Sequence, residues 1–338
     1  MRAVRLHTFG PAENLVHETV ADPVPGPGQV RVAVTAAGVH LVDAALRAGD
    51  PNGPYPLPEL PTVPGREVAG TVDALGEGTD PRWLGRRVVA HLGAVPGGYA
   101  ELAVTDAGRL HEIPDGVGDA EAIAMIGTGR TALGILSFTE LGERDEKDVV
   151  IVTAAAGGVG SLLVQYARNA GATVVGLAGG PAKVRHVRAL GADIALDYTA
   201  PDWTERARTE LWGRSATVVL DGVGGDAARA AVGLLGPGGT HLVFGWSSRG
   251  TTGGGPLELT PEELSARSLT SRNVLGPAML ERFGGGQTGL RRLEELALSD
   301  AAAGTVVPAV QRFRLADAAA AHRALETRAT TGKVVLVP

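Results

Sequence analysis

The sequence predicts an α/β protein in which a turn-rich antiparallel barrel is followed by a doubly wound parallel sheet. Residues 149–177 contain a short apolar strand, a glycine turn, a helix and a second strand, which is the unit that builds parallel sheets. From about residue 121 helical and strand patterns alternate. Residues 1–110 instead hold short strands divided by proline and glycine, which is typical of antiparallel structure.

The N-terminal part predicts a compact barrel that contains one helix. The helix covers residues 41–48 and ends at Gly49, and a proline-heavy loop follows over residues 51–64. The apolar runs that predict strands lie at residues 4–6, 30–35, 68–72, 87–91 and 99–104.

The unit at 149–177 has the pattern of a dinucleotide-binding turn. Val149–Val152 is a continuous β-branched run, which predicts a strand buried on both faces. Ala155, Gly157 and Gly160 then follow at the spacing GxGxxG, before a helical pattern that Gly171 closes. A pyrophosphate binds the free N–H groups at a helix N-terminus only where side chains are absent or tiny. The turn therefore predicts a pyrophosphate site.

The remaining patterns complete a six-stranded parallel sheet and then leave it. Further strands are predicted at 194–196, 217–220, 240–244 and 271–275, with helices at 181–190 and 226–235. Later helices are predicted at 262–269, 290–298 and 315–326, and the last strand, 332–338, is expected to return to the N-terminal barrel. The predicted domains are 1–121, 122–258 and 259–338. The third segment is expected to rejoin the N-terminal barrel, except for the strand near 271–275, which is expected to be the sixth strand of the parallel sheet.

The end of the second sheet strand indicates which dinucleotide binds. NAD sites usually carry an acidic residue there, about 20 residues after the glycines. This chain has Gly179, Gly180 and Pro181 there, followed by Lys183 and Arg185. No carboxylate repels a 2′-phosphate and a cation attracts one, which favours NADPH. Alternatively, the two cations are only the solvated face of the next helix.

The amino-acid composition limits the classes of protein to which this chain can belong. The 338 residues are 44% hydrophobic and 20% charged, with a net charge of −6. That balance is typical of a globular protein and gives no general attraction to nucleic acid or anionic membranes. The chain has no cysteine, no apolar leader and no long apolar stretch, so a cytoplasmic enzyme without disulfides or Cys-ligated zinc is expected.

Taken together, the motifs of the whole chain resemble those of the zinc-independent medium-chain dehydrogenases/reductases, the NADPH:quinone oxidoreductases. The segments that carry this resemblance are residues 37–43 (AGVHLVD), 64–72 (PGREVAGTV), 98–101 (GYAE), 154–160 (AAAGGVG), 221–225 (DGVGG) and 332–335 (GKVV).

The resemblance implies a GroES-like β-barrel catalytic domain, a Rossmann domain and a cleft between them. Zinc alcohol dehydrogenases of this superfamily have cysteine at the position of His40 and histidine at that of Arg66. Their four-cysteine structural zinc loop is absent as well. No metal site is therefore expected. The quinone reductases more often have Asn at position 40.

The resemblance also implies a set of NADPH-binding residues. Tyr198 and Phe244 have alternative interpretations, as a strand-end aromatic and as core. The implied set is Thr131, Ala156, Gly157, Gly158, Val159, Gly160, Gly179, Lys183, Tyr198, Val223, Phe244, Gly245 and Ser247.

The implied reaction is hydride transfer from NADPH to a quinone or a related unsaturated carbonyl compound. Charge then develops on the substrate and calls for a proton donor. Tyr55 is the first candidate, with His40 and Asp43 as alternatives. Tyr55 alternatively lines the cleft, Asp43 alternatively braces its helix, and quinones need little acid catalysis. Arg66 and Arg130 each have two possible roles. Either residue could face the cleft and favour polar or anionic substrates, or could form an ion pair at the surface.

Two other functions remain open. One is an enoyl or enone reductase of biosynthetic type, which a product assay would separate from a quinone reductase. The other is a non-catalytic NADPH- or RNA-binding protein, which the acidic charge and the 4% aromatic content disfavour. The resemblance further implies a homodimer that acts on a small molecule.

Overall fold

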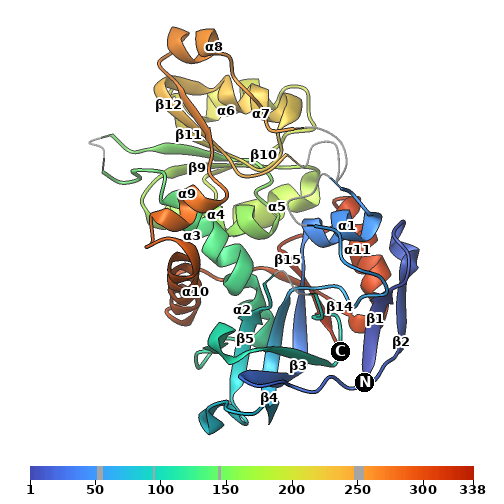
Figure 1. Ribbon diagram of the computed structural model, residues 1–338. Coiled ribbons are helices and arrows are strands. Elements are labelled where there is room, and N and C mark those ends of the chain that lie inside the picture. Colours follow the sequence, from blue (N-terminus) through green and yellow to red (C-terminus); the bar gives the residue numbers. More distant parts are fainter. Residues whose placement is uncertain (52–55, 94–95, 144–145, 247–254) are drawn as a thin grey trace. The chain divides into compact units, whose positions relative to one another are not determined.

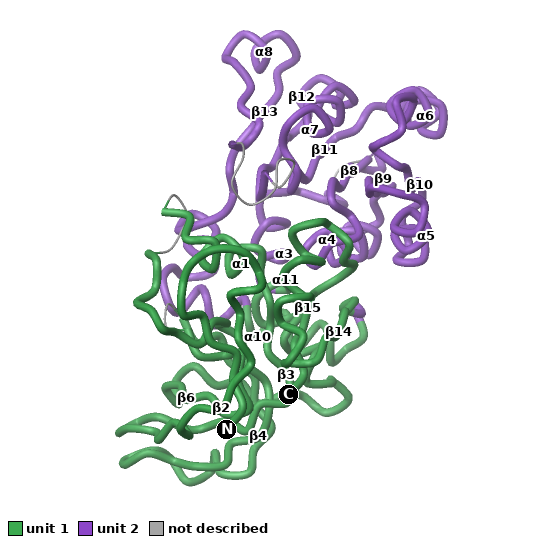
Figure 2. Tube along the Cα trace, turned by 90° about the vertical axis from the view of Figure 1, so that its right-hand side faces the viewer, with its two compact units in different colours: residues 1–129, 294–304, 308–338 green, residues 130–293, 305–307 purple. Residues whose placement is uncertain are grey.

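The computed structural model describes residues 1–51, 56–93, 96–143, 146–246 and 255–338. The chain forms two compact units, which are coloured separately in Figure 2. Unit 1 comprises residues 1–129, 294–304 and 308–338, and unit 2 comprises residues 130–293 and 305–307. These divisions differ from the predicted boundaries after residues 121 and 258, because residues 259–293 stay with the parallel sheet.

Unit 2 is built on a six-stranded parallel sheet in the order β10-β9-β8-β11-β12-β13, the 3-2-1-4-5-6 order of doubly wound folds. This confirms the predicted fold class. Helices α4 and α5 cover one face of the sheet, and α6 and α7 cover the other (Figure 1). The strands are β8 (Val149–Val152), β9 (Thr173–Ala178), β10 (Ile194–Asp197), β11 (Ala216–Asp221), β12 (Leu235–Val243) and β13 (Thr270–Asn273).

Two helices of unit 2 begin or end at the signals that the sequence provides, whereas the helices at 130–136, 203–210 and 277–281 were not predicted. Helix α5 begins at Pro181, whose fixed φ suits a first turn. After α4, Gly171 adopts φ +85°, a left-handed conformation that favours glycine. The helices are α3 (Arg130–Leu136), α4 (Gly158–Asn169), α5 (Pro181–Ala189), α6 (Trp203–Glu210), α7 (Gly225–Val232), α8 (Pro261–Ala266) and α9 (Pro277–Glu281).

The predicted sixth strand is present as β13, and it pairs in parallel with β12. Strand β12 is longer than predicted, because Gly236–Gly239 extend it instead of ending it. Its pairing with β11 shifts register between Ala216 and Val218, so these extra residues form an irregularity at the strand's start.

Unit 1 is built on a mostly antiparallel seven-stranded sheet and a separate β1–β2 ribbon. The C-terminal strand β15 pairs with β3, which confirms the predicted return, and its parallel partner β14 was not predicted. The strands are β1 (Arg2–Leu6), β2 (Leu15–Thr19), β3 (Gln29–Val39), β4 (Glu67–Leu75), β5 (Arg87–His91), β6 (Leu102–Asp106), β7 (Leu110–Glu112), β14 (Val310–Arg314) and β15 (Lys333–Val337).

Strand β3 organises unit 1. Along its eleven residues it pairs with β4 on one side, and with β6 and then β15 on the other. Val30 and Val32 point into the core beside Val72 and Val88, and all four are almost fully buried. The helical segments are α1 (Leu41–Ala48), α2 (Asp119–Ile123), the π-helical turn η4 (Ala124–Gly129), α11 (Ala318–Glu326) and the later part of α10 (Gly286–Ala302).

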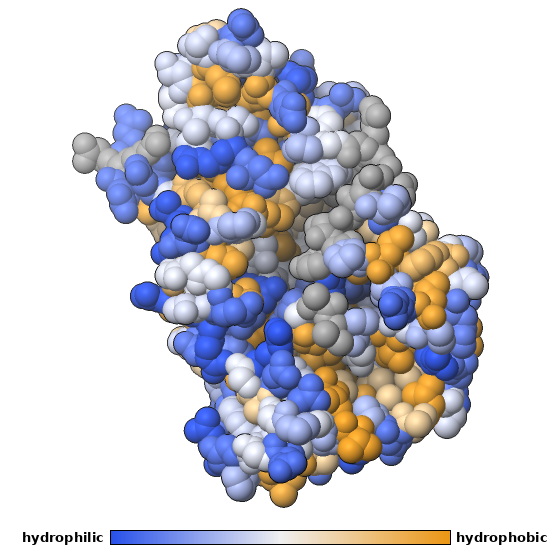
Figure 3. Space-filling model, viewed as in Figure 1, coloured by the Kyte–Doolittle hydropathy of each residue, from blue (hydrophilic) through white to orange (hydrophobic). Residues whose placement is uncertain are grey.

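The molecular surface is mixed in character. On the face drawn in Figure 3, hydrophilic and hydrophobic residues are interspersed in small patches. Within the described part of the chain, no helix combines the length and the apolar character needed to cross a membrane.

Candidate active site

The glycine turn between β8 and α4 has the geometry of an anion-binding loop. Gly157 is the N-cap of α4 and no side chain caps this end, so the first-turn N–H groups face outward from the helix. A Cβ on Gly160 would collide with the backbone of Ala154, whose own φ is +49°. Ala156 is buried beside the turn. The predicted residues 156–160 thus run from the turn into the first residues of α4, an arrangement that fits a pyrophosphate.

A second loop of unit 2 is held by a buried carboxylate at the end of β11. Asp221 Oδ1 accepts hydrogen bonds from the Val223 N–H (2.9 Å), the Gly224 N–H (3.1 Å) and the Thr153 hydroxyl (3.0 Å). The hydroxyl of Thr153 in turn accepts the Gly222 N–H at 2.8 Å. Asp221 therefore joins the ends of β8 and β11 and fixes the backbone around Val223.

Phe244 and Gly245 lie against this second loop. A Cβ on Gly222 would come within 2.6 Å of the Phe244 ring, and one on Gly245 within 2.9 Å of the Gly222 carbonyl oxygen. Val223, Phe244 and Gly245 are thus brought together, as the sequence predicts for a nicotinamide-side loop. Ser247 lies outside the described residues.

The segment expected to hold the 2′-phosphate gathers at the ends of β9 and β10. A Cβ on Gly179 would lie 3.5 Å from the Tyr198 hydroxyl. Asp197 accepts the Thr199 N–H (2.9 Å) and hydroxyl (2.6 Å). Burial raises the pKa of Asp197, but bonds from Thr199 and the Gly180 N–H outweigh this and lower it. Lys183 is half-buried in the first turn of α5.

We predict that Lys183→Ala weakens NADPH binding by about 10- to 100-fold, roughly 1.5–3 kcal/mol, because a charge-assisted contact to the 2′-phosphate is lost. NADH has no such phosphate, so its affinity should stay nearly unchanged. Titrations followed by nicotinamide fluorescence measure both dissociation constants. Arg188→Ala, on an exposed position of the same helix, is the control. Equal losses for both cofactors would contradict the assignment.

Thr131 is the second residue of α3, which follows directly on the π-helical turn η4, and it is half-buried. A π-helical turn is uncommon and is often found at functional sites. The contact of Thr131 with the cofactor stays a prediction.

In unit 1, His40 belongs to a buried cluster of three ionisable side chains. Its Nε2 lies 2.8 Å from Glu67 Oε1 and 2.8 Å from Lys333 Nζ, and that Nζ lies 2.8 Å from Glu67 Oε2. The side chains of Glu67 and Lys333 are 0% and 4% exposed, whereas that of His40 is 28% exposed. His40 is therefore the member of the cluster that a substrate can reach.

Packing and charge both fix Glu67 in this position. Gly38 and Gly127 leave the space that its carboxylate fills, because a Cβ on either residue would collide with the carboxylate oxygens. Burial by itself raises the pKa of Glu67, but the charges of His40 and Lys333 outweigh this and hold it well below its usual range. The cluster thus contains a permanent carboxylate.

Asp43 braces the helix that His40 begins. Its Oδ2 accepts the backbone N–H of His40 at 2.8 Å and the Tyr99 hydroxyl at 3.3 Å, and its Oδ1 lies 3.4 Å from Arg66 Nη2. Asp43 is only 3% exposed. This geometry supports the bracing alternative over a direct role in proton transfer. It also places Arg66 in a buried ion pair.

A buried histidine extends this network. The His322 ring packs edge-on against Tyr99, and its Nε2 lies 3.1 Å from the Tyr99 hydroxyl. Burial lowers the pKa of His322 from its ordinary value of 6.5 to about 4, although the charge of Asp43 opposes this. Burial, together with Asp43, also raises the pKa of the Tyr99 hydroxyl. Both rings are therefore neutral near pH 7.

We expect His322 to make the fold sensitive to acid. The unfolded chain takes up a proton on this histidine below about pH 6.5, whereas the folded chain resists protonation until about pH 4. Its contribution is therefore complete above pH 6.5 and is lost towards pH 4, by about 2 kcal/mol at pH 5. Urea unfolding at pH 7.5 and pH 5 should show a smaller difference for His322→Gln than for the wild type. His7→Gln at the surface should not reduce the difference, and an unchanged His322→Gln difference would contradict this account.

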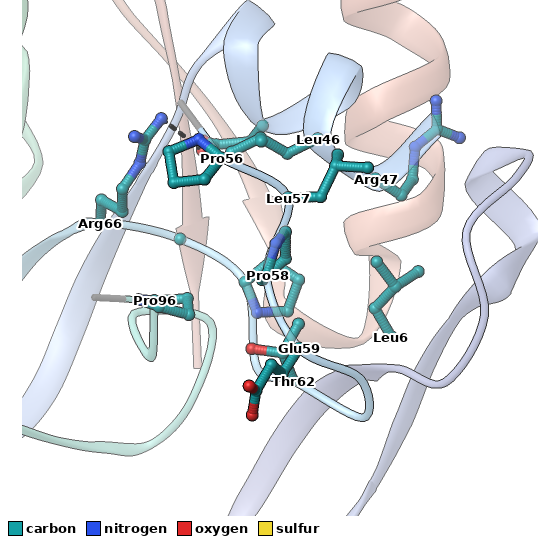
Figure 4. Close-up of a pocket in the computed structure, with 13 residues that line it drawn as sticks. Leu6, Leu46, Arg47, Pro56, Leu57, Pro58, Glu59, Thr62, Arg66 and Pro96 are labelled. Carbon is teal, nitrogen blue, oxygen red and sulfur yellow. Dashed lines mark hydrogen bonds and ion pairs between the residues drawn. The ribbon is translucent and has the colours of Figure 1, made fainter. Parts of the chain in front are cut away.

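A pocket of about 300 Å³ lies beside α1, the 56–65 loop and Pro96 (Figure 4). Its walls are mainly proline and leucine, and Asp43 also lines it. In the close-up, the Arg66 guanidinium is at one end of the pocket and the Arg47 side chain extends towards the other. Such an apolar cavity with a few polar groups fits a small organic ligand. Tyr55, the first candidate proton donor, lies outside the described residues.

Sequence reasoning missed four residues of this site. Glu67 and Lys333 are both within motifs that carry the family resemblance, and so is Tyr99. Their burial next to His40 and Asp43 depends on the pairing of β15 with β3 and of β3 with β4. His322 lies outside those motifs, and no signal in the sequence separates it from an ordinary helical histidine.

Comparisons with known proteins agree with this picture. Residues 26–115 match the family described as alcohol dehydrogenase GroES-like domain, and residues 158–283 match the family described as zinc-binding dehydrogenase. A 2-haloacrylate reductase from Burkholderia is 32% identical, with 99% of this chain and 98% of that protein covered. A quinone oxidoreductase from Pseudomonas aeruginosa is also 32% identical, with 100% and 99% covered.

The structural comparison gives the same assignment of fold. The crystal structure of Escherichia coli quinone oxidoreductase complexed with NADPH aligns over the full length of both chains, with a TM-score of 0.83 and 27% identity. Within the described residues, no three His, Cys, Asp or Glu side chains are grouped so that they could hold a metal ion.

Proposed function

This chain belongs to the medium-chain dehydrogenase/reductase family, and we propose that it reduces both enones and quinones, which are electron-poor unsaturated carbonyl compounds. It is an NADPH-dependent oxidoreductase. The observation that carries the proposal is the His40–Glu67–Lys333 cluster, which presents one partly exposed imidazole held by two buried charges.

The residues of unit 2 fit the cofactor. NADPH, when bound, supplies a hydride. The uncapped N-terminus of α4 suits the pyrophosphate, and Lys183 suits the 2′-phosphate. Asp221 holds the backbone around Val223 for the nicotinamide side.

In this proposal His40 gives a proton to the carbon or oxygen that becomes negatively charged when the substrate accepts the hydride. Its ring has one exposed side and one side fixed by Glu67 and Lys333. Because the ring is already held in one orientation, it loses little orientational freedom when it reacts. Arg66 and the apolar walls of the pocket beside α1 receive the rest of the substrate.

We further propose that the reaction needs no zinc. Lys333 Nζ lies 2.8 Å from both His40 and Glu67, so an ammonium group already occupies the place of a cation between them. Arg66, the neighbour of Glu67, is a guanidinium and cannot ligate a metal. Dialysis against a chelator should leave kcat unchanged within twofold, and added Zn²⁺ should not raise it. Loss of activity that Zn²⁺ restores would contradict the proposal.

The test uses wild type, His40→Ala and His40→Asn with cyclohex-2-enone and with 1,4-benzoquinone as acceptors. We expect wild type to oxidise NADPH with the enone and His40→Ala to lower that kcat by about 100-fold. The quinone rate should fall much less, because a reduced quinone oxygen accepts a proton readily from water. No enone turnover by wild type, or equal enone rates in all three proteins, would overturn the proposal.

A dedicated quinone reductase is the second candidate. Its support is the name of the Pseudomonas aeruginosa and Escherichia coli relatives, whereas the Burkholderia relative is named for a reaction on an unsaturated acid. The same acceptors decide between the two, because a quinone reductase would turn over benzoquinone and leave the enone unreacted.

We also propose that the protein is a homodimer. Strand β13 ends the strand order of the parallel sheet, so its outer edge can pair with a second copy. Light scattering coupled to gel filtration should give twice the chain mass of 34.5 kDa. A monomeric mass at micromolar concentration would contradict this.

A further inference from the structure

The geometry of the His40 cluster restricts where its protons can lie. Nε2 of His40 is within 2.8 Å of both Glu67 Oε1 and Lys333 Nζ. A single ring nitrogen cannot accept from the ammonium and donate to the carboxylate at the same time. Two arrangements of the protons are therefore possible, and each satisfies one of the two contacts of Nε2.

In the first arrangement Lys333 is an ammonium that donates to Nε2, and the neutral imidazole carries its proton on Nδ1. In the second, the proton has moved from Nζ to Nε2. Lys333 is then a neutral amine, and an imidazolium donates to Glu67. Both arrangements have the same total charge and differ by one proton shifted across 2.8 Å.

We propose that Lys333 supplies, through His40, the proton that the reduced substrate receives. This rests on the proposed function, in which His40 is the proton donor. The Nδ1–H bond breaks as the new C–H bond of the substrate forms. At the same time the Nζ–H bond breaks and the Nε2–H bond forms. A proton from the solvent then binds Nδ1, and the proton on Nε2 returns to Nζ, so the cluster regains its starting state and one solvent proton is consumed.

Burial and residue choice both support this role. Lys333 is 4% exposed and His40 is 28% exposed, so exchange with water passes through His40. The other charged or titratable groups around the cluster are Asp43, which accepts the His40 backbone N–H, and His91, whose charge acts on Glu67. The chain has only three lysines among its 31 basic residues. An arginine at 333 would preserve the charge, but arginine does not release its proton.

Lys333 does not touch the reacting atoms and acts through His40, so its test needs a readout that a purely structural role would not change. In Lys333→Arg the positive charge beside Glu67 remains and the transferable proton is lost. We expect kcat with cyclohex-2-enone to fall by about 100-fold and kcat with 1,4-benzoquinone to fall by less than about threefold. The enone kcat–pH profile of Lys333→Arg should also differ from that of wild type, because the Nζ proton no longer takes part in the transfer. Lys147→Arg, an exposed lysine, is the control.

If the larger arginine prevents folding, the double variant Glu67→Gln/Lys333→Met removes both buried charges together and provides the same test. It should bind NADPH as wild type does and show the same selective loss with the enone. Suppose that wild type turns over the enone and that Lys333→Arg or the double variant has the same rate and pH profile. That result would overturn the proton-supply role. It would leave the proposed function standing, whereas absence of enone turnover in wild type refutes both.

Discussion

Gly160→Ala is expected to weaken NADPH binding by about 100-fold or more. The added Cβ would collide with the carbonyl of Ala154 and lie 2.9 Å from the Cα of Ala155. Both contacts are with backbone atoms, which cannot rotate away as the end of a flexible side chain could. Ala154 is already in a left-handed conformation at φ +49°, so the turn has little freedom to adjust. The N-terminus of α4 must therefore shift away from its anion, and a shift of about 1 Å is enough for such a loss.

Fluorescence titration with NADPH measures this effect, and circular dichroism shows that the variant is folded. Gly108→Ala is the control, because a Cβ there meets no atom within 4 Å and the backbone φ is ordinary. A folded Gly160→Ala variant that binds NADPH as tightly as wild type would show that the turn does not bind the pyrophosphate.

Glu67→Gln is expected to lower the free energy of unfolding by about 3–5 kcal/mol. The substitution leaves the Lys333 ammonium, which is 4% exposed, buried without its carboxylate. Chemical denaturation at pH 7.5 measures the loss. Lys333→Met should cost a similar amount, because it leaves the buried Glu67 carboxylate without the ammonium that lies 2.8 Å from it.

The double variant Glu67→Gln/Lys333→Met closes a thermodynamic cycle. Since it removes both buried charges, we expect it to be more stable than either single variant, which requires a coupling of at least about 3 kcal/mol. Additive losses would show that the two side chains do not interact across the 2.8 Å that separates them.

The sequence predicts the parallel sheet well because its signals are local. The β-branched run at 149–152, the glycine spacing at 155–160 and the proline that begins α5 each determine backbone conformation within a few residues. The glycine turn before α4 and the segments at 222–224 and 244–245 follow from strand order, because parallel strands end at one edge of the sheet. The predicted cofactor residues are grouped mainly for this reason.

The cluster around His40 could not be predicted in the same way. It combines residues 40, 67 and 333, and its formation depends on the C-terminal strand pairing with β3. The burial of Lys333, which decides its chemistry, is likewise a property of packing. Asp43 and Arg66 were candidates for the substrate site, and only the structure shows that they pair with each other. Strand β14 was missed because its alternation of polar and apolar residues is weak.

The central claim is that a hydride passes from NADPH to an unsaturated carbonyl compound while the protein supplies the proton. NADPH carrying deuterium at C4, in each of its two stereoisomers, tests it most directly when the reaction with cyclohex-2-enone is followed by mass spectrometry and NMR. The account predicts one deuterium at the carbon β to the carbonyl from one stereoisomer only, and a solvent proton at the α carbon. Bound NADPH that transfers deuterium from neither stereoisomer would contradict it.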